Sequence, residues 1–296
     1  MIFFLSFLLC VITSELYFRF CYCESDGLGV TLAHQKWIRK YWKPLNSNGL
    51  RDREWTEKDL ANKKIIQVIG DSFPAGHGIK NAQDRFPDVL ANRLGEKYAV
   101  VNFSFPGWGT RTELFILKNY PLMPNIVILS YFPNDITDAS KEHGSRSPDK
   151  VHIPVGIIRK VISRSYFLNY VYWDIFRIRN LNADYFKWLE DQFNNPAIWN
   201  THKRELELVC ELTREKNAKL IVILFPFLTR KVSSDLIIEK VKGVFKSKNV
   251  PVLEVSDLIG DLKENELIVS KIDAHPNVKI HKLVGDELYK FVVMPD

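Results

Sequence analysis

The chain has 296 residues, of which 46% are hydrophobic and 26% are charged. This balance excludes an intrinsically disordered chain, and the length suits one large α/β domain or two small ones. The formal net charge is +6, but lysine and arginine are interspersed with aspartate and glutamate along most of the chain. Because a nucleic-acid-binding surface needs clustered basic residues, we expect no nucleic-acid partner. The four cysteines show neither zinc-site spacing nor a disulfide framework.

An apolar segment opens the chain. Ile2 to Thr13 is almost unbroken, and aromatic residues continue to Cys23 around Glu15 and Arg19. The shorter run has the length of a signal-peptide core, whereas the longer one reaches the about 20 residues of a membrane span. No basic residue precedes it, and neither a small-residue cleavage site nor a lipobox is evident. We therefore favour an uncleaved signal anchor in residues 1–23, over a cleaved signal peptide or a buried core helix.

This segment also sets the expected location. We expect the protein to be membrane-anchored or secreted, with the rest of the chain extracytoplasmic. The nearest basic residues after the segment are Lys36, Arg39, Lys40 and Lys43. Read strictly, the positive-inside rule would place them in the cytoplasm, so the topology stays open.

The elements after the anchor alternate between strands and helices. Residues 24–63 are polar and predict an irregular lead-in, and a single domain is expected over 64–296. The elements expected in that domain are, in chain order, strand 65–69, helix 86–94, strand 98–103, helix 110–120, strand 126–131, helix 205–216, strand 220–225, helix 235–245, strand 250–255 and a final amphipathic helix after Pro276. Such an alternation predicts a parallel sheet covered by helices on both faces.

A long insertion separates the third and fourth expected strands, over about 138–200. It opens with a polar loop and continues as a helical stretch rich in tyrosine, phenylalanine and tryptophan. Aromatic residues at helical spacing usually pack onto a core, and we expect that here. The alternative is a lid or an acyl-binding wall over a site.

Polar turns follow the strands at the edge where open α/β sheets bind their ligands, outside the carboxyl ends. The turns contain Gly70-Asp71-Ser72 after the first strand, Ser104-Phe105-Pro106-Gly107 after the second, Phe132-Pro133-Asn134-Asp135 after the third, and Asp273-Ala274-His275-Pro276-Asn277 past a connector after the fifth. Together they supply a hydroxyl, an imidazole, a carboxylate, a side-chain amide and candidate backbone donors.

These groups suit acyl transfer from a serine. The Ser72 hydroxyl needs a base to take its proton, and His275 titrates near neutral pH. A third group, Asp273, would fix the histidine tautomer. The oxyanion needs preorganised donors, for which the candidates are the N–H groups of Ser72 and Gly107 and the side-chain amide of Asn134. Each also has a plainer interpretation: a helix cap for Ser72, a tight turn for Gly107 and an Asx turn for Asn134.

The segments GDSFPAGHGI, SFPGWGT, FPND and DAHPN resemble, in order, the four sequence blocks of the SGNH (GDSL) hydrolases. The resemblance covers about Lys64 to the C-terminus. It implies a flavodoxin-like three-layer α/β/α fold with a central parallel five-stranded sheet. It also implies Ser72 as nucleophile and first oxyanion donor, Gly107 and Asn134 as the other donors, and Asp273 with His275 as the activating pair. No cofactor or metal ion is expected.

Two positions depart from the family pattern. Phe132 stands where a glycine is usual, two residues before the asparagine, and only Ala274 separates Asp273 from His275 where two residues are usual. The short spacing resembles a D-x-H-P-N variant, and it leaves open whether a backbone carbonyl orients the histidine instead. Among the other histidines, His77 is the one that we expect near the pocket.

The sequence thus predicts a serine esterase acting through an acyl-enzyme on Ser72. The resemblance implies an ester of a lipid, an acylated sugar or a small acyl group as substrate. Two alternatives stay open: acyl transfer to a sugar hydroxyl by the same residues, and glycan or lipid binding without catalysis.

Overall fold

The fold was analysed in a computed structural model that describes residues 2–148, 153–177, 183–229 and 233–294. A central sheet of five parallel strands has the order β2-β1-β3-β4-β5. Its strands are β1 (Lys64–Gly70), β2 (Tyr98–Ser104), β3 (Ile126–Tyr131), β4 (Lys219–Leu224) and β5 (Val252–Glu254). This is the strand order of flavodoxin-like sheets, so the fold class predicted from the sequence is confirmed.

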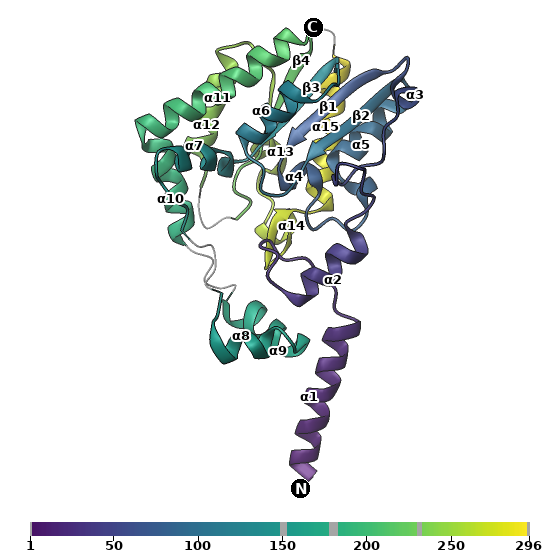
Figure 1. Ribbon diagram of the computed structural model, residues 1–296, viewed down its shortest axis with the longest axis vertical. Helices are drawn as coiled ribbons and strands as arrows, with labels where there is room; N and C mark the ends of the chain where they lie inside the picture. The colour runs from purple at the N-terminus through teal and green to yellow at the C-terminus, as the bar shows by residue number, and fades with distance from the viewer. Residues whose placement is uncertain (1, 149–152, 178–182, 230–232, 295–296) are drawn as a thin grey trace.

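Helices cover both faces of the sheet (Figure 1). One core cluster joins the sheet to α6 (Thr110–Asn119), α11 (Pro196–Glu215) and α12 (Asp235–Lys246). The other cluster joins it to α5 (Phe86–Leu94), α13 (Val255–Ile259) and α15 (Val278–Val293). Side chains alternate along β3, with Val127 and Leu129 in the first cluster and Ile126 and Ile128 in the second. The strands are mostly apolar because both of their faces are buried.

The carboxyl ends of three strands meet at one edge. Gly70, the last residue of β1, pairs with Ser104 of β2 on one side and with Ser130 of β3 on the other. The turns after these strands therefore start side by side. The remaining short elements of the domain are α4 (Ser72–Ala75), η1 (Ala82–Asp84), η2 (Gly95–Lys97), η3 (Pro133–Ile136) and α14 (Glu264–Leu267).

A small antiparallel hairpin, which the sequence did not predict, carries the last motif. It consists of β6 (Ile268–Ser270) and β7 (Asp273–Pro276). Its strands are too short to show a hydrophobic alternation, so the sequence indicated only a connector. The pairing gives residues 273–276 the extended backbone of a strand.

The N-terminal part contains α1 (Ile2–Phe20), α2 (Leu32–Tyr41) and α3 (Glu57–Leu60). The expectation of an irregular lead-in over 24–63 is wrong for α2. Thr31 caps this helix by accepting a hydrogen bond from the His34 N–H, and the helix buries Ala33 and Trp37 on one face. Because only one narrow face is buried, the average composition stays polar and hides the helix.

The insertion divides into two parts. It contains α7 (Thr137–Glu142), α8 (Gly156–Ile162), α9 (Tyr166–Tyr170), the π-helix η4 (Val171–Arg177) and α10 (Ala183–Asn194), while 149–152 and 178–182 lie outside the described residues. Phe186 of α10 packs on Phe227 of the core, with ring centroids 4.8 Å apart. Tyr170 of α9 instead stacks on Phe18 of α1 at 4.2 Å. Packing of the aromatic residues onto the core is therefore confirmed for α10 but not for α9.

Candidate active site

Ser72, His275 and Asp273 form one hydrogen-bonded chain at the carboxyl edge of the sheet. Ser72 begins α4 directly after β1, and its Oγ lies 2.9 Å from His275 Nε2. His275 Nδ1 lies 2.6 Å from Asp273 Oδ1. A carboxylate accepts hydrogen bonds, so Nδ1 carries the hydrogen and Nε2 is free to accept the Ser72 proton. The structure thus brings together the three residues that the sequence proposed as nucleophile, base and orienting group.

The hairpin explains the short spacing between Asp273 and His275. Residues two apart on a strand project to the same side, so the Asp273 side chain meets the His275 side chain, which contacts Ser72, whereas Ala274 is exposed. Asp273 Oδ1 also accepts a hydrogen bond from the backbone N–H of His275, at 3.2 Å. In this geometry the carboxylate itself, not a backbone carbonyl, contacts the imidazole.

Asp273 is fully buried and contacted on its other oxygen as well. Oδ2 accepts a short hydrogen bond from the Ser25 hydroxyl and lies 3.8 Å from His77 Nε2. Burial alone would raise the pKa of Asp273, but His275, His77 and the Ser25 hydroxyl outweigh it and hold the pKa below its usual value. The group is therefore a carboxylate throughout the neutral range.

His77 lies against the imidazole of His275. Its ring stacks on His275 with centroids 4.2 Å apart, and His34 stacks on its other face at 5.1 Å. His77 Nε2 donates to the Asp26 carbonyl at 2.8 Å. Burial, and then the neighbouring His275, lower the pKa of His77 to about 4, so this ring is neutral at physiological pH. The sequence placed His77 near the pocket; the structure buries it as a support for the His275 ring.

The proposed oxyanion donors come from three neighbouring turns. Asn134 Nδ2 lies 3.4 Å from Asp71 Oδ2, and the same oxygen lies 3.4 Å from Ser72 Oγ, so Asp71 links the two. Gly107 follows β2 in a turn closed by a 3.1 Å hydrogen bond from Trp108 N to the Phe105 carbonyl, and its φ is +86°. That value suits the third residue of a type II turn, which favours glycine. Gly107 is exposed, and no contact given for the described residues joins it to Ser72.

Buried carboxyl groups lie behind Ser72. Asp71 caps α4 by accepting the Phe73 N–H at 3.0 Å, and burial raises its pKa. Glu113 of α6 and Asp135 of η3 are fully buried nearby. Burial, and then the charge of Asp71, raise the pKa of Glu113 well above its usual value, and burial with Glu113 does the same for Asp135. The environment therefore favours the protonated, uncharged acids.

Aromatic rings extend from the imidazole along the sheet edge. Phe73 lies edge-on to His275 at 5.5 Å and contacts Phe132 at 4.6 Å, and Phe132 contacts Phe227 at 5.7 Å. Phe132, which stands where the SGNH hydrolases usually have glycine, thus adds a half-buried ring to this row.

A metal ion would have to share these same groups. His77, Asp273 and His275 offer ligand atoms that all lie within 4.8 Å of one another. His77 Nε2 and His275 Nδ1 already take part in hydrogen bonds, so a cation bound there would compete with the serine chemistry.

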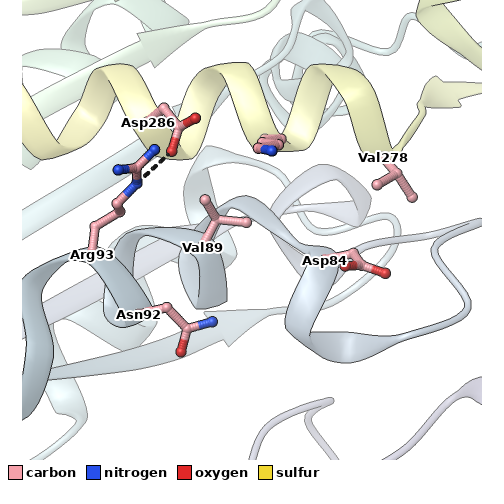
Figure 2. A pocket seen from close by; sticks show the side chains of 7 residues that line it. Asp84, Val89, Asn92, Arg93, Val278 and Asp286 are labelled. Atoms are coloured by element: carbon pink, nitrogen blue, oxygen red, sulfur yellow. Dashed lines mark hydrogen bonds and ion pairs between the residues drawn. The ribbon is translucent and has the colours of Figure 1, made fainter.

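A surface hollow lies elsewhere, between α5 and α15 (Figure 2). It is lined by Asp84, Val89, Asn92, Arg93, Val278, Lys282 and Asp286. Arg93 and Asp286 form an ion pair across it at 2.8 Å. Since Ser72, Asp273 and His275 do not line it, the hollow is separate from the candidate site.

Sequence reasoning missed Ser25 and Asp26, and it assigned no role to Asp71. Asp71 and His77 belong to the same block as Ser72, so that block holds a signal for them. Ser25 and Asp26 lie in the lead-in, where no motif marks them. Only the folded chain brings Ser25 to Asp273.

No family model matches the sequence, and no curated protein matches it. Solved structures do align with the fold. The crystal structure of TesA aligns over 77% of this chain and 98% of its own, with a TM-score of 0.47 and 14% identity. A carbohydrate acetylesterase family member from Sinorhizobium meliloti aligns over 77% of this chain and 97% of its own, with a TM-score of 0.44 and 12% identity. A member of the lipolytic protein G-D-S-L family from Veillonella parvula aligns over 78% of this chain and 97% of its own, with a TM-score of 0.43 and 14% identity.

These TM-scores are below 0.5. A function for this chain therefore has to be argued from the geometry of its site.

Proposed function

We propose that this chain is a serine ester hydrolase that works through an acyl-enzyme on Ser72. The observation that carries this proposal is the continuous chain of contacts, 2.9 Å from Ser72 Oγ to His275 Nε2 and 2.6 Å from His275 Nδ1 to Asp273 Oδ1. A hydroxyl, an imidazole and a buried carboxylate in this order are the parts that serine acyl transfer needs.

The mechanism follows from the positions of these groups. His275 Nε2 takes the Ser72 proton while Oγ attacks the ester carbonyl, and the imidazolium then gives that proton to the leaving alcohol. The N–H groups of Ser72 and Gly107 and the amide of Asn134 would hold the oxyanion. Water, activated by His275, attacks the acyl-enzyme, releases the acid and regenerates Ser72.

The substrate class is an ester of a lipid, an acylated sugar or a small acyl group. Phe132 supports an apolar acyl part, because its half-buried ring lies against Phe73, which in turn contacts His275. Burial of an acyl chain on such surface is favourable by about 25 cal/mol per Å². A screen across acyl chain lengths and acetylated sugars would identify the preferred ester.

A fluorophosphonate probe tests the nucleophile. We expect the wild-type protein to be labelled and Ser72→Ala to remain unlabelled. Ser140→Ala is the matched control, because Ser140 is a buried serine whose hydroxyl donates to the Ile136 carbonyl, four residues earlier in the chain. No labelling of wild-type protein with a folded circular-dichroism spectrum would leave binding without catalysis as the better interpretation. Product analysis with sugar acceptors would then separate hydrolysis from acyl transfer.

We also propose that α1 is retained as a membrane anchor. Its Glu15 side chain accepts hydrogen bonds from Ser165 Oγ at 2.7 Å and from the Phe167 N–H at 3.0 Å. Cleavage after α1 would remove these contacts. The helix is apolar and long enough to span a membrane, and it is not buried against the protein. The mass of the protein purified from membranes tests this, since a mass lacking residues 1–23 would contradict it.

A further inference from the structure

The segment 153–170, which includes α8 and α9 and is called the α8–α9 segment below, exposes an apolar surface. Ile157 of α8 is 77% exposed and Val155 just before it is 74% exposed. Other large apolar residues that are exposed in the segment are Ile153, Ile158, Val161 and Leu168. Several exposed apolar side chains so close together indicate an interaction surface rather than ordinary protein surface.

The α8–α9 segment is attached to the C-terminal part of α1. Glu15 caps the start of α9, accepting hydrogen bonds from Ser165 and from the Tyr166 and Phe167 N–H groups. Phe18 stacks on Tyr170, and Arg19 donates to the Arg164 carbonyl at 3.0 Å. Figure 1 shows α8 and α9 beside this end of α1, below the sheet domain. The level of the segment along α1 is therefore fixed.

The length of α1 shows where that level lies relative to a bilayer. The helix has 19 residues, about 28 Å at 1.5 Å per residue, which matches the about 30 Å of a hydrocarbon core. When α1 spans such a core, Phe20 lies at its boundary and Glu15 lies about 8 Å inside it. The charge of Glu15 is compensated there by Arg19, at 2.6 Å, and by the α9 cap. Helices that lie in the interface bury their apolar face by about 5–10 Å, which is the same depth.

The chemistry of the surroundings suits a membrane–water interface. Tyrosine and phenylalanine side chains gather around the contact between α1 and α9, as in the aromatic belts of membrane proteins; they are Tyr17, Phe18, Tyr22, Tyr166, Phe167 and Tyr170. Arg159, Lys160 and Arg164 are exposed on the same segment as the apolar residues. Their long side chains can reach anionic headgroups while the apolar residues contact acyl chains.

We propose that the α8–α9 segment lies in the interface of the same bilayer that α1 spans. A second attachment next to the anchor would hold the sheet domain at a fixed height and orientation above the membrane. The proposal rests on α1 spanning a membrane. It does not depend on the chemistry of Ser72, so an inactive enzyme would leave it standing.

Depth-dependent quenching tests the proposal with the full chain in vesicles of phosphatidylcholine containing a minority of phosphatidylglycerol. Cys10, Cys21 and Cys23 are replaced by alanine, and buried Cys210 stays. Single cysteines introduced by Leu8→Cys, Ile157→Cys and Leu236→Cys carry an environment-sensitive fluorophore. All three positions are exposed, so labelling leaves the fold intact, and Leu236 of α12, at 83% exposure, is the matched aqueous control.

We expect the label at position 8 to be quenched by lipids with a deep spin label, the label at 157 by lipids with a shallow one, and the label at 236 by neither. Equal behaviour of 157 and 236 would overturn the proposal. A blue-shifted label at 157 that no spin-labelled lipid quenches would mean that protein covers the surface, which also overturns it. An aqueous label at position 8 would remove its basis, because α1 would then not span the bilayer.

Discussion

The two oxygens of the Asp273 carboxylate have different partners. Oδ1 accepts hydrogen bonds from the imidazole and the backbone of His275, and Oδ2 accepts one from Ser25. The first oxygen fixes the histidine tautomer, whereas the second fixes the rotation of the carboxylate itself. Both effects are needed for a 2.9 Å approach of His275 to Ser72.

Asp273→Asn should therefore abolish most of the activity without unfolding the protein. An amide that donates to Ser25 or His275 favours the wrong tautomer, which in a serine triad costs about 10⁴ in kcat. The measurement is kcat/KM on a short-chain ester together with the rate of fluorophosphonate labelling. A loss of less than about tenfold in either rate would show that the carboxylate does not orient the base.

Ser25→Ala should lower kcat by about tenfold and leave KM unchanged. A hydrogen bond to a charged group is worth about 1.5–3 kcal/mol, and 1.4 kcal/mol corresponds to a factor of ten. Ser25 contacts Asp273 and not Ser72, so the substitution should act through the position of the Asp273 carboxylate. Ser140→Ala removes a buried hydroxyl elsewhere and should keep kcat. An unchanged kcat in Ser25→Ala would assign Ser25 to stability alone.

Gly78→Ala should disturb the same carboxylate at Oδ2, the oxygen that Ser25 contacts. The φ of Gly78 is +82°, and an added Cβ would lie 2.6 Å from Val269 Cγ2 and 2.9 Å from Asp273 Oδ2. Gly144→Ala is the control, because its φ is +75° but no atom lies within 4 Å of the added Cβ. Both variants should lose about 1 kcal/mol of stability to the backbone. Only Gly78→Ala should lose about 1–3 kcal/mol more to overpacking, together with activity. Equal urea midpoints for Gly78→Ala and Gly144→Ala would show that the added Cβ at position 78 is not crowded.

The sequence could single out Ser72, Asn134, Asp273 and His275 as candidates because each stands in a short polar motif after a predicted strand or its connector. Their supports could not be found in this way. Ser25 and Asp273 lie far apart in the sequence, and neither periodicity nor spacing reports a contact of that kind. His77 was near enough to Ser72 to draw attention, but stacking on His275 depends on the left-handed turns around it.

At the level of elements, the buried strands were the easiest to predict. Strand β3 has the same bounds in the sequence prediction and in the structure, because an apolar run between turns has few alternatives. Helix α5 also matches, with Pro87 near its start and Gly95 after its end. Helix α11 begins earlier than expected, at Pro196, because the Asn195 side chain caps it. The sequence prediction marked only the C-terminal part of α11, although Ile198 near its start is also buried in the core cluster of the sheet.

Helix α6 carries a buried acid toward the site, and this should make stability depend on pH. The native state keeps the proton of Glu113 at pH values where the unfolded chain, with an ordinary pKa of about 4.3, has lost it. A group whose pKa is raised by folding binds more protons in the native state than in the unfolded chain. The free energy of unfolding therefore falls as the pH rises from the unfolded-state pKa to the native-state pKa.

Glu113→Gln should therefore flatten the decline in stability that sets in as the pH rises above the ordinary glutamate pKa of about 4.3. The amide cannot ionise, while Asp71 and Asp135 keep their share of the slope. Urea unfolding at several pH values measures this pH dependence of the free energy of unfolding. Glu96→Gln, at an exposed position, is the control. A slope that is unchanged by Glu113→Gln would mean that the native protein ionises Glu113 at little cost.

At the scale of the whole molecule, the sheet domain and the N-terminal helix are joined through the insertion. The sequence predicted an anchor and an aromatic insertion as separate features. It could not predict that α9 packs on α1, because that contact joins residues about 150 positions apart. The charged residues Glu15 and Arg19, which interrupt the apolar segment, pair with each other and with α9.

Glu15→Ala should loosen α9 while leaving the sheet domain intact. The substitution removes the acceptor of the Tyr166 and Phe167 N–H groups. A helix cap is worth about 0.5–2 kcal/mol, so hydrogen exchange of these two amides should speed up about 2- to 30-fold. Glu24→Ala is the control, because Glu24 follows α1 but pairs with Lys80 at 2.8 Å. Unchanged exchange at Tyr166 and Phe167 would show that α9 holds its place without α1, and the fixed level of the α8–α9 segment along the anchor would then need another cause.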